Sequence, residues 1–192
     1  MYQNLLGDEQ FLSWLLSCDR DLAEEVRKRG CPKCGGQLHR ADYPRKPRGG
    51  PVATDPQQDQ RFSFCCCEDG CRHRVTPPSL RFLGRRVYLS TVVILSQVLR
   101  SGASPARVSE LEQMVGASAR TLRRWRRWWQ STLPASRFWQ TARGQLCDHL
   151  DPGELPHALL DRFGGDARDR LHGLLRFLSP ITGGAAAQEL AR

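Results

Sequence analysis

The sequence lacks any long run of apolar residues. Its longest aliphatic stretch, residues 92–95, has four residues, whereas a membrane-spanning helix needs about 20. Asp8 and Glu9 lie near the N-terminus, where a secretory signal peptide requires positive charge followed by an apolar segment. These absences exclude a membrane as partner. We therefore expect a cytoplasmic chain, in which clustered cysteines serve as metal ligands rather than as disulfides.

Acidic residues are missing between Ala117 and Gln145. Over the wider span of residues 80–145 the chain has 12 basic and 2 acidic residues, a net charge of +10, which exceeds the +9 of the whole chain. A solvated charged face usually mixes both signs, and a block of one sign repels itself unless a polyanion offsets the charge. This excess predicts a nucleic-acid partner.

Residues 31–79 have few aliphatic side chains and cannot build an ordinary hydrophobic core, but they contain two cysteine motifs. The first is Cys31-Pro-Lys-Cys34-Gly-Gly, and the second, about thirty residues later, ends at Cys71. This spacing is typical of a zinc ribbon, in which four thiolates bind one Zn²⁺ ion. A cubane iron–sulfur cluster is the alternative. Four thiolates leave no open position for substrate, so we expect a structural zinc that supplies folding energy.

The second motif offers three consecutive cysteines for one ligand position beside Cys71. On a strand, Cys65 and Cys67 point to one face and Cys66 points to the other, which leaves Cys66 and Cys67 as alternatives. Other candidates lie among basic residues or have no companion at ligand spacing, and they are not expected to bind the metal: His39, His73, Cys18 and Cys147.

Helical spacing of apolar residues recurs along the rest of the chain. Residues 8–29 are expected to form a helix with Asp8 as its N-terminal cap, a second start at Asp19, and Gly30 as its terminator. Further helices are expected over residues 87–102, 105–115, 119–131 and 166–178, with Ser104 and Ser118 as caps. On the helix over 105–115, the expected buried residues are Val108, Leu111 and Met114. Residues 41–60 contain four prolines and are expected to form a polar loop.

The helix over residues 119–131 separates apolar from basic side chains. Leu122, Trp125 and Trp129 recur at three- and four-residue spacing and are expected to face inward. A glycine turn joins this helix to the preceding one in helix-turn-helix geometry, and an arginine face on the second helix suits the major groove of DNA. The residues expected to contact DNA are Ser118, Arg120, Thr121, Arg123, Arg124 and Arg127. Those near the helix start are expected at base edges, and Arg127, together with Arg126, at the backbone.

The predicted fold class is α+β, mainly α: a small zinc ribbon of short antiparallel strands followed by a helical helix-turn-helix domain. The predicted organisation is an N-terminal helical segment (1–30), the zinc ribbon (31–79), the DNA-binding domain (80–145) and a C-terminal helical tail (146–192).

Three motifs, CPKCGG, RFSFCCCEDGCRHRVTP and SARTLRRWRRWW, together resemble the N-terminal region of ISL3-like insertion-sequence transposases over residues 31–130. The resemblance favours Cys66 with Cys71 as the second ligand pair. It implies recognition of transposon-end DNA, with double-stranded DNA as partner alongside a separate transposase or a second copy of the chain. The catalytic domain of such transposases needs more than the 47 residues that follow Gln145, so we expect no catalytic centre.

The sequence therefore predicts a zinc-dependent DNA-binding protein that is transposon-associated and not an enzyme. The alternatives are an RNA-binding zinc-ribbon protein and a transcriptional regulator unrelated to transposition. A nuclease subunit would need the carboxylates of the acidic C-terminal segment around a divalent metal. A protein–protein adaptor would use the leucine stripe between Leu171 and Leu178.

Overall fold

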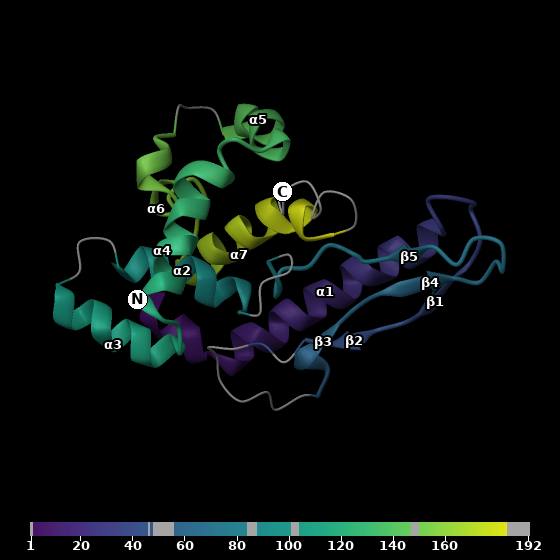
Figure 1. Cartoon of the computed structure of the whole chain (residues 1–192), viewed down its shortest axis with the longest axis horizontal. Coiled ribbons are helices and arrows are strands. Elements are labelled where there is room, and N and C mark those ends of the chain that lie inside the picture. The colour runs from purple at the N-terminus through teal and green to yellow at the C-terminus, as the bar shows by residue number, and fades with distance from the viewer. Residues whose placement is uncertain are drawn as a thin grey trace.

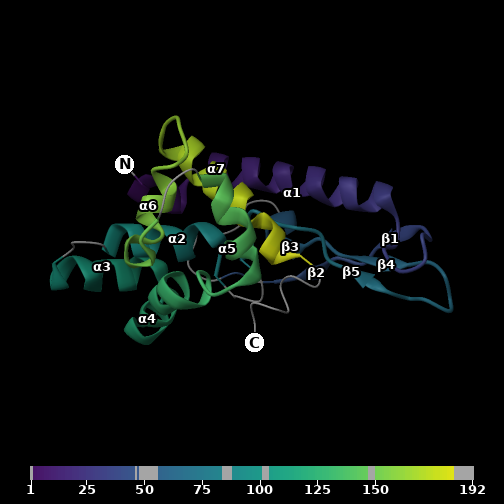
Figure 2. The same cartoon turned by 90° about the horizontal axis from the view of Figure 1, so that it is seen from above.

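The computed structural model describes residues 2–45, 47, 56–83, 88–100, 104–146 and 150–183. Over these residues the fold is α+β and mainly helical, as predicted, with two small antiparallel sheets. One long helix, α1, runs along the molecule (Figure 1). The strands lie alongside its C-terminal half, and the other helices gather around its N-terminal half. The view from above shows the same division (Figure 2).

The α-helices are α1 (Glu9–Arg29), α2 (Ser90–Arg100), α3 (Pro105–Val115), α4 (Ala119–Arg127), α5 (Arg137–Ala142), α6 (His157–Leu160) and α7 (Ala167–Leu178). Short 3₁₀ helices cover Tyr2–Gly7, Pro56–Asp59, Arg143–Leu146, Pro152–Glu154 and Ser179–Thr182, and a π-helical turn covers Trp128–Thr132. The strands are β1 (Leu38–Arg40), β2 (Tyr43–Pro44), β3 (Gln60–Arg61), β4 (Phe64–Cys66) and β5 (Arg74–Val75).

The strands form two antiparallel sheets, one in the order β1-β4-β5 and the other of β2 with β3. Leu38 pairs with Cys66 in the first sheet, and Tyr43 pairs with Arg61 in the second. The expectation of a polar loop over residues 41–60 was therefore wrong at both ends, because backbone pairing between β2 and β3 closes the segment. Residues 46 and 48–55 of that segment lie outside the described residues.

Several predicted helix boundaries are confirmed by their caps. The side chains of Asp8, Ser104 and Ser118 each accept a hydrogen bond from a backbone N–H in the first turn of α1, α3 and α4. Gly116 ends α3 with φ +58°, in the left-handed region that favours glycine. The helix predicted over 119–131 ends its α-helical part at Arg127 and continues as the π-helical turn.

Two clusters of buried side chains form the core. The larger one contains residues of α1, α2, α4 and α7 and of the segment 80–83. The smaller one lies between α1 and the sheets and contains Leu16, Ala23, Cys31, Leu38, Phe62, Phe64 and Cys66. Because α1 contributes to both clusters, it joins the helical part of the molecule to the cysteine-bearing part.

Asp19 does not start a second helix, contrary to the prediction, because α1 passes through it without a break. The side chain is fully buried, and its carboxylate accepts hydrogen bonds from Ser79 Oγ at 2.6 Å, from the Leu80 backbone N–H at 2.6 Å and from Arg81 Nε at 2.8 Å. These partners lie about sixty residues away in the chain, so local sequence pattern alone does not reveal them.

Arg81 is almost completely buried and bridges several elements beyond Asp19. Its guanidinium donates to the backbone carbonyls of Gln57, Gln58 and Gln60 at 2.6–2.9 Å. A second buried arginine, Arg61, donates to two further backbone carbonyls, those of Pro77 and Thr182. Burial lowers the pKa of Arg61 to about 10, which still leaves it charged at neutral pH. Together the two arginines tie α1, the segment 56–61 and the C-terminal end of the described chain to one another.

Replacing Asp19 with Asn should lower the free energy of unfolding by about 3–5 kcal/mol, because Arg81 is then left as a buried charge without its counter-ion. Chemical denaturation followed by circular dichroism measures this loss. Glu24→Gln is the matched control, since it breaks an ion pair with Arg27 that is about half exposed and should cost less than about 1 kcal/mol. Equal losses in the two variants would contradict this account.

Candidate functional site

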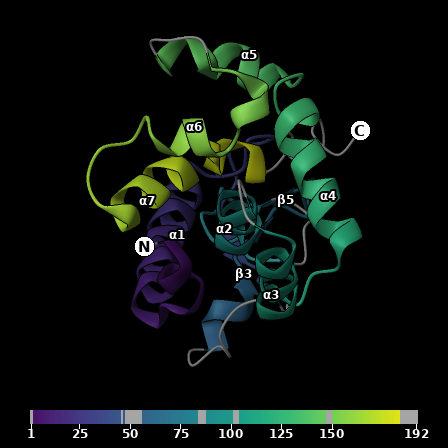
Figure 3. The same ribbon diagram turned by 90° about the vertical axis from the view of Figure 1, so that its left-hand side faces the viewer.

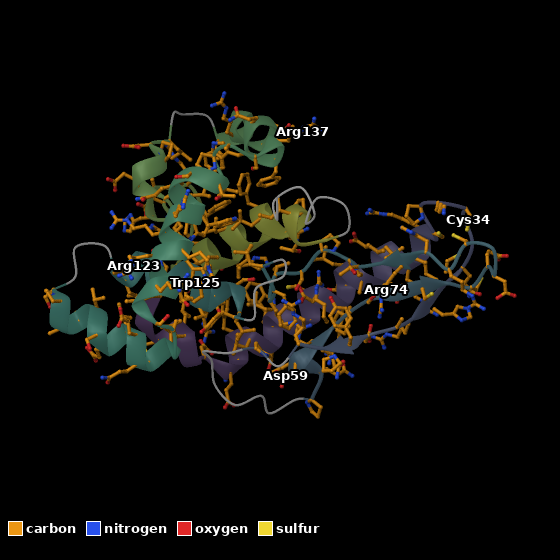
Figure 4. All side chains as sticks on the ribbon, in the orientation of Figure 1. Cys34, Asp59, Arg74, Arg123, Trp125 and Arg137 are labelled. Atoms are coloured by element: carbon orange, nitrogen blue, oxygen red, sulfur yellow. The ribbon has the colours of Figure 1, made fainter. Side chains whose placement is uncertain are left out.

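Four cysteines come together at one end of the molecule, and we call Cys31, Cys34, Cys66 and Cys71 the cysteine cluster. Their four sulfur atoms all lie within 4.8 Å of one another. The Sγ–Sγ distance is 3.7 Å between Cys31 and Cys71 and 3.4 Å between Cys34 and Cys66. Both distances are much longer than a disulfide bond of about 2.05 Å, and all four cysteines are free. The cluster could hold one metal ion. Its end of the molecule is marked by Cys34 in Figure 4.

The first cysteine pair is positioned by a tight turn after α1. The Gly35 N–H donates to the carbonyl of Cys31, and the Cys31 N–H donates to the carbonyl of Gly36, both at 2.8 Å. Gly35 has φ +76°, a conformation that side chains disfavour. A Cβ atom on Gly36 would lie 2.7 Å from Glu68 Cγ, 3.2 Å from Cys66 Sγ and 3.3 Å from Cys34 Sγ. Glycine at this position therefore avoids a clash with Glu68 and close contacts with the two sulfurs.

Strand β4 selects Cys66, rather than Cys67, for the cluster. Cys66 is fully buried opposite Leu38 of β1. Cys65 and Cys67 make other contacts: the Cys65 thiol approaches the carbonyl of Arg72 at 3.6 Å, and the Cys67 thiol approaches a carboxylate oxygen of Glu68 at 3.3 Å. A turn begins at Glu68, whose carbonyl accepts a hydrogen bond from the backbone N–H of Cys71 at 2.9 Å. This turn brings Cys71 back to the cluster. His39 and His73 are exposed and do not belong to it.

The thiols of the cluster differ in how readily they ionise. Burial opposes the thiolate of Cys31, but the backbone N–H groups of Lys33 and Cys34 donate to its sulfur and hold its pKa at about 7. The backbone N–H of Glu68 favours the thiolate of Cys66, but burial and the neighbouring sulfurs raise its pKa to about 12. Four thiolates at this spacing repel one another, so their joint ionisation requires a bound cation. The chemistry of the donor set thus fits a metal ion.

Cys18 lies outside the cluster on α1. Its sulfur is half-buried and lies 3.8 Å from Nε2 of His172 on α7. Burial raises the pKa of this thiol and lowers the pKa of His172, so both groups favour their neutral forms. Cys147 lies outside the described residues.

A second feature, the pair of helices α3 and α4, lies at the other end of the molecule. Gly116 ends α3, and α4 begins three residues later at Ala119. The hydroxyl of Tyr88 donates to the Gly116 carbonyl at 3.1 Å, and the side-chain amide of Gln97 donates to the carbonyl of Leu122 at 3.2 Å. These bonds hold the turn and α4 against α2 and the segment that precedes it.

The inward face of α4 and of the π-helical turn that continues it is the one predicted. Leu122, Trp125 and Trp129 are each no more than 1% exposed. Trp128, which the spacing did not identify, is also buried and packs edge-to-face on Trp129, because the π-helical turn shifts the side chains that follow Arg127.

On α3 the predicted buried stripe was only partly right. Leu111 is buried, but Met114 is 43% exposed and Val108 is only half-buried. Val115 takes the second buried position. It lies four residues after Leu111, on the same side of the helix.

The outward face of α4 carries four exposed arginines, Arg120, Arg123, Arg124 and Arg127, which we call the arginine face. At 100° per residue these four positions lie within an arc of about 100° on one side of the helix. None of them forms an ion pair with a residue in the described ranges. Seen from the end of the molecule, α4 lies at the periphery beside α2 and α3 (Figure 3).

Of the other predicted contact residues, Ser118 is exposed and its Oγ accepts from the Thr121 N–H at 3.4 Å, capping α4. The hydroxyl oxygens of Ser118 and Thr121 lie 3.2 Å apart. Figure 4 shows Arg123 near one end of the long axis and Cys34 near the other. The structure therefore gathers the four cysteines in one place and the predicted contact residues of α4 in another.

Comparison of the chain with protein-family models, with curated proteins and with solved structures finds no match. Among the described residues, the helices are too short or too polar to cross a membrane.

Replacing Cys66 with Ser should abolish stoichiometric metal binding and unfold the β1-β4-β5 sheet, because the variant removes a buried ligand from the smaller core cluster. Metal analysis of the purified protein and near-UV circular dichroism measure the two effects. Cys67→Ser is the matched control on the adjacent residue and should retain the metal. A metal content that falls with Cys67→Ser and not with Cys66→Ser would refute the assigned ligand set.

Proposed function

We propose that the chain is a zinc-dependent DNA-binding protein, in which α3, the turn at Gly116 and α4 act as a helix-turn-helix. The arginine face is the observation that carries this proposal. Four cations on one side of a nine-residue helix repel one another, and no carboxylate among the described residues forms an ion pair with them. A row of phosphates would neutralise this charge, and guanidinium groups also match the acceptors at the edge of guanine.

The geometry of α4 favours duplex DNA over RNA as the partner. An α-helix fits the major groove of B-form DNA, whereas the major groove of A-form RNA is too deep and narrow for side chains to read. In this mode Arg120, Thr121 and Arg124 contact base edges, while Arg126 and Arg127 contact the DNA backbone. Ser118 is a weaker candidate for a base contact, since its hydroxyl caps the helix.

Zinc is the metal that best fits the cysteine cluster. A tetrahedral Zn²⁺ with Zn–S bonds of about 2.3 Å holds its sulfurs roughly 3.8 Å apart. This is close to the Sγ–Sγ distances of 3.7 Å between Cys31 and Cys71 and 3.4 Å between Cys34 and Cys66. In a cubane iron–sulfur cluster each thiolate binds a different iron, which separates the sulfurs further. With all four positions filled by cysteine, the ion has a structural role: it would hold together a core cluster that contains Cys31 and Cys66 themselves.

The motifs that resemble those of insertion-sequence transposases favour transposon ends as the DNA on which the proposed protein acts. We propose an accessory or recognition protein without enzymatic activity, which acts with a separate transposase or with a second copy of the chain. A transcriptional regulator would use the same α4 surface on a different DNA site, and the DNA sequence selected by the protein would separate the two roles.

Arg124→Gln should weaken binding to a preferred duplex, obtained by selection from random sequences, by about 1–3 kcal/mol, with a smaller loss on unrelated duplexes. Fluorescence anisotropy over a range of salt concentrations measures both. Arg27→Gln removes the same charge from the exposed end of α1 and serves as the control; it should leave binding unchanged. If the wild-type protein binds the duplex no more tightly than Arg124→Gln, or prefers an RNA hairpin, the proposed reading of DNA by α4 is wrong.

A further inference from the structure

A pocket of about 580 Å³ opens beside α4, on the flank away from Arg124. Its walls come from four elements: the end of α2, the start of α3, the end of α4 with the π-helical turn, and the segment 153–157. The polar side chains that line it are Gln97, Arg100, Arg126, Gln130, Glu154 and His157.

The pocket carries an excess of positive charge. Its lining includes two arginines, Arg100 and Arg126, and only one carboxylate, that of Glu154. Neither arginine forms an ion pair with a described residue. One guanidinium nitrogen of Arg100, Nη1, is buried and has no hydrogen-bond acceptor within the ranges that the structure describes. Leaving a buried N–H without an acceptor is costly, and an anion in the pocket would supply that acceptor.

Hydrogen bonds hold the walls in place. The side-chain amide of Gln130 donates to the carbonyl of Gly153 at 3.0 Å and so ties the segment 153–157 to the π-helical turn that follows α4. Gln97 is 7% exposed, and the hydrogen bond from its side-chain amide to the Leu122 carbonyl ties α2 to α4. The two arginines therefore project from elements that are fixed relative to one another, which favours binding of an anion over a loosely held surface charge.

We infer that this pocket binds a phosphate group through Arg100 and Arg126. Guanidinium groups bind phosphate through paired, charge-assisted hydrogen bonds. The volume exceeds that of the bare ion and accommodates an attached sugar. Two sources share this chemistry: a backbone phosphate of bound DNA, and the phosphate of a free nucleotide.

The position of Arg126 on α4 relates the pocket to the proposed DNA surface. Arg126 follows Arg123 by three residues, which places it about 60° around the helix axis from Arg123 and at the edge of the arginine face. A DNA strand that runs along this edge brings a phosphate to the mouth of the pocket. This source rests on the proposed function, whereas binding of a free nucleotide does not.

The test has two arms and uses the full chain. In the first, ³¹P nuclear magnetic resonance follows the titration of the protein with inorganic phosphate and with a nucleoside monophosphate at constant ionic strength. We expect Arg126→Gln to weaken binding by about tenfold or more, the loss typical of a hydrogen bond to a charged group. Val108→Trp, which fills the pocket without changing its charge, should also weaken it. Arg27→Gln should not, and circular dichroism checks that each variant is folded.

In the second arm, the salt dependence of duplex binding is compared between the same variants. If a DNA phosphate occupies the pocket, Arg126→Gln lowers the slope of log K against log salt by about 1, and Val108→Trp lowers it as well. If the two variants weaken binding of phosphate or nucleotide but do not change the salt dependence of duplex binding, the pocket binds a free nucleotide. This result would support the phosphate site even if the protein does not bind duplexes at all.

The inference is overturned if Arg126→Gln and Val108→Trp behave like Arg27→Gln in both arms. In that case wild-type duplex binding that is sensitive to Arg124→Gln would still support the proposed function, so the two failures are distinguishable.

Discussion

The buried contact between Asp19 and Arg81 is the constraint on which the arrangement of the molecule depends. It lies in the middle of α1, where the larger core cluster gives way to the smaller one. A buried ion pair contributes little net stability by comparison with an apolar contact, but it has a strict geometric requirement, because each charge must find its partner. Arg81 also donates to three backbone carbonyls of residues 57–60. The pair therefore specifies how the sheets dock on α1, which apolar packing alone would specify less strictly.

The cysteine cluster and the arginine face lie toward opposite ends of the molecule, as the positions of Cys34 and Arg123 show (Figure 4). A metal ion bound by the cysteines would stabilise the smaller core cluster, in which Cys31 and Cys66 are themselves core residues. It would not touch α4. The position of α4 depends instead on Leu122, Trp125 and Trp129, on the bond from Gln97 and on the turn at Gly116. Metal binding and the proposed DNA contact thus act through separate sets of side chains, which α1 connects.

Most features determined by neighbouring residues could be predicted from the sequence, and so could the meeting of the two cysteine motifs, whose spacing is itself a signal. The other features determined by distant contacts could not. The caps Asp8, Ser104 and Ser118 act within one turn, and the buried stripe of α4 follows from helical spacing. The buried role of Asp19 was missed because its partners lie about sixty residues away. The choice between Cys66 and Cys67 needed the register of β4 against β1. The pocket beside α4 was missed as well, because its walls come from elements far apart in the chain.

The continuity of α1 has a consequence for how this chain tolerates insertions and deletions. Its 21 residues span about 30 Å at 1.5 Å per residue, and they carry contacts to both core clusters. One residue added near the middle of α1 would turn one end by about 100° relative to the other. Every side chain beyond that point would then face the wrong neighbour. Length changes that preserve the protein are therefore expected in connecting segments, and α1 should keep its length wherever both ends of the molecule are retained.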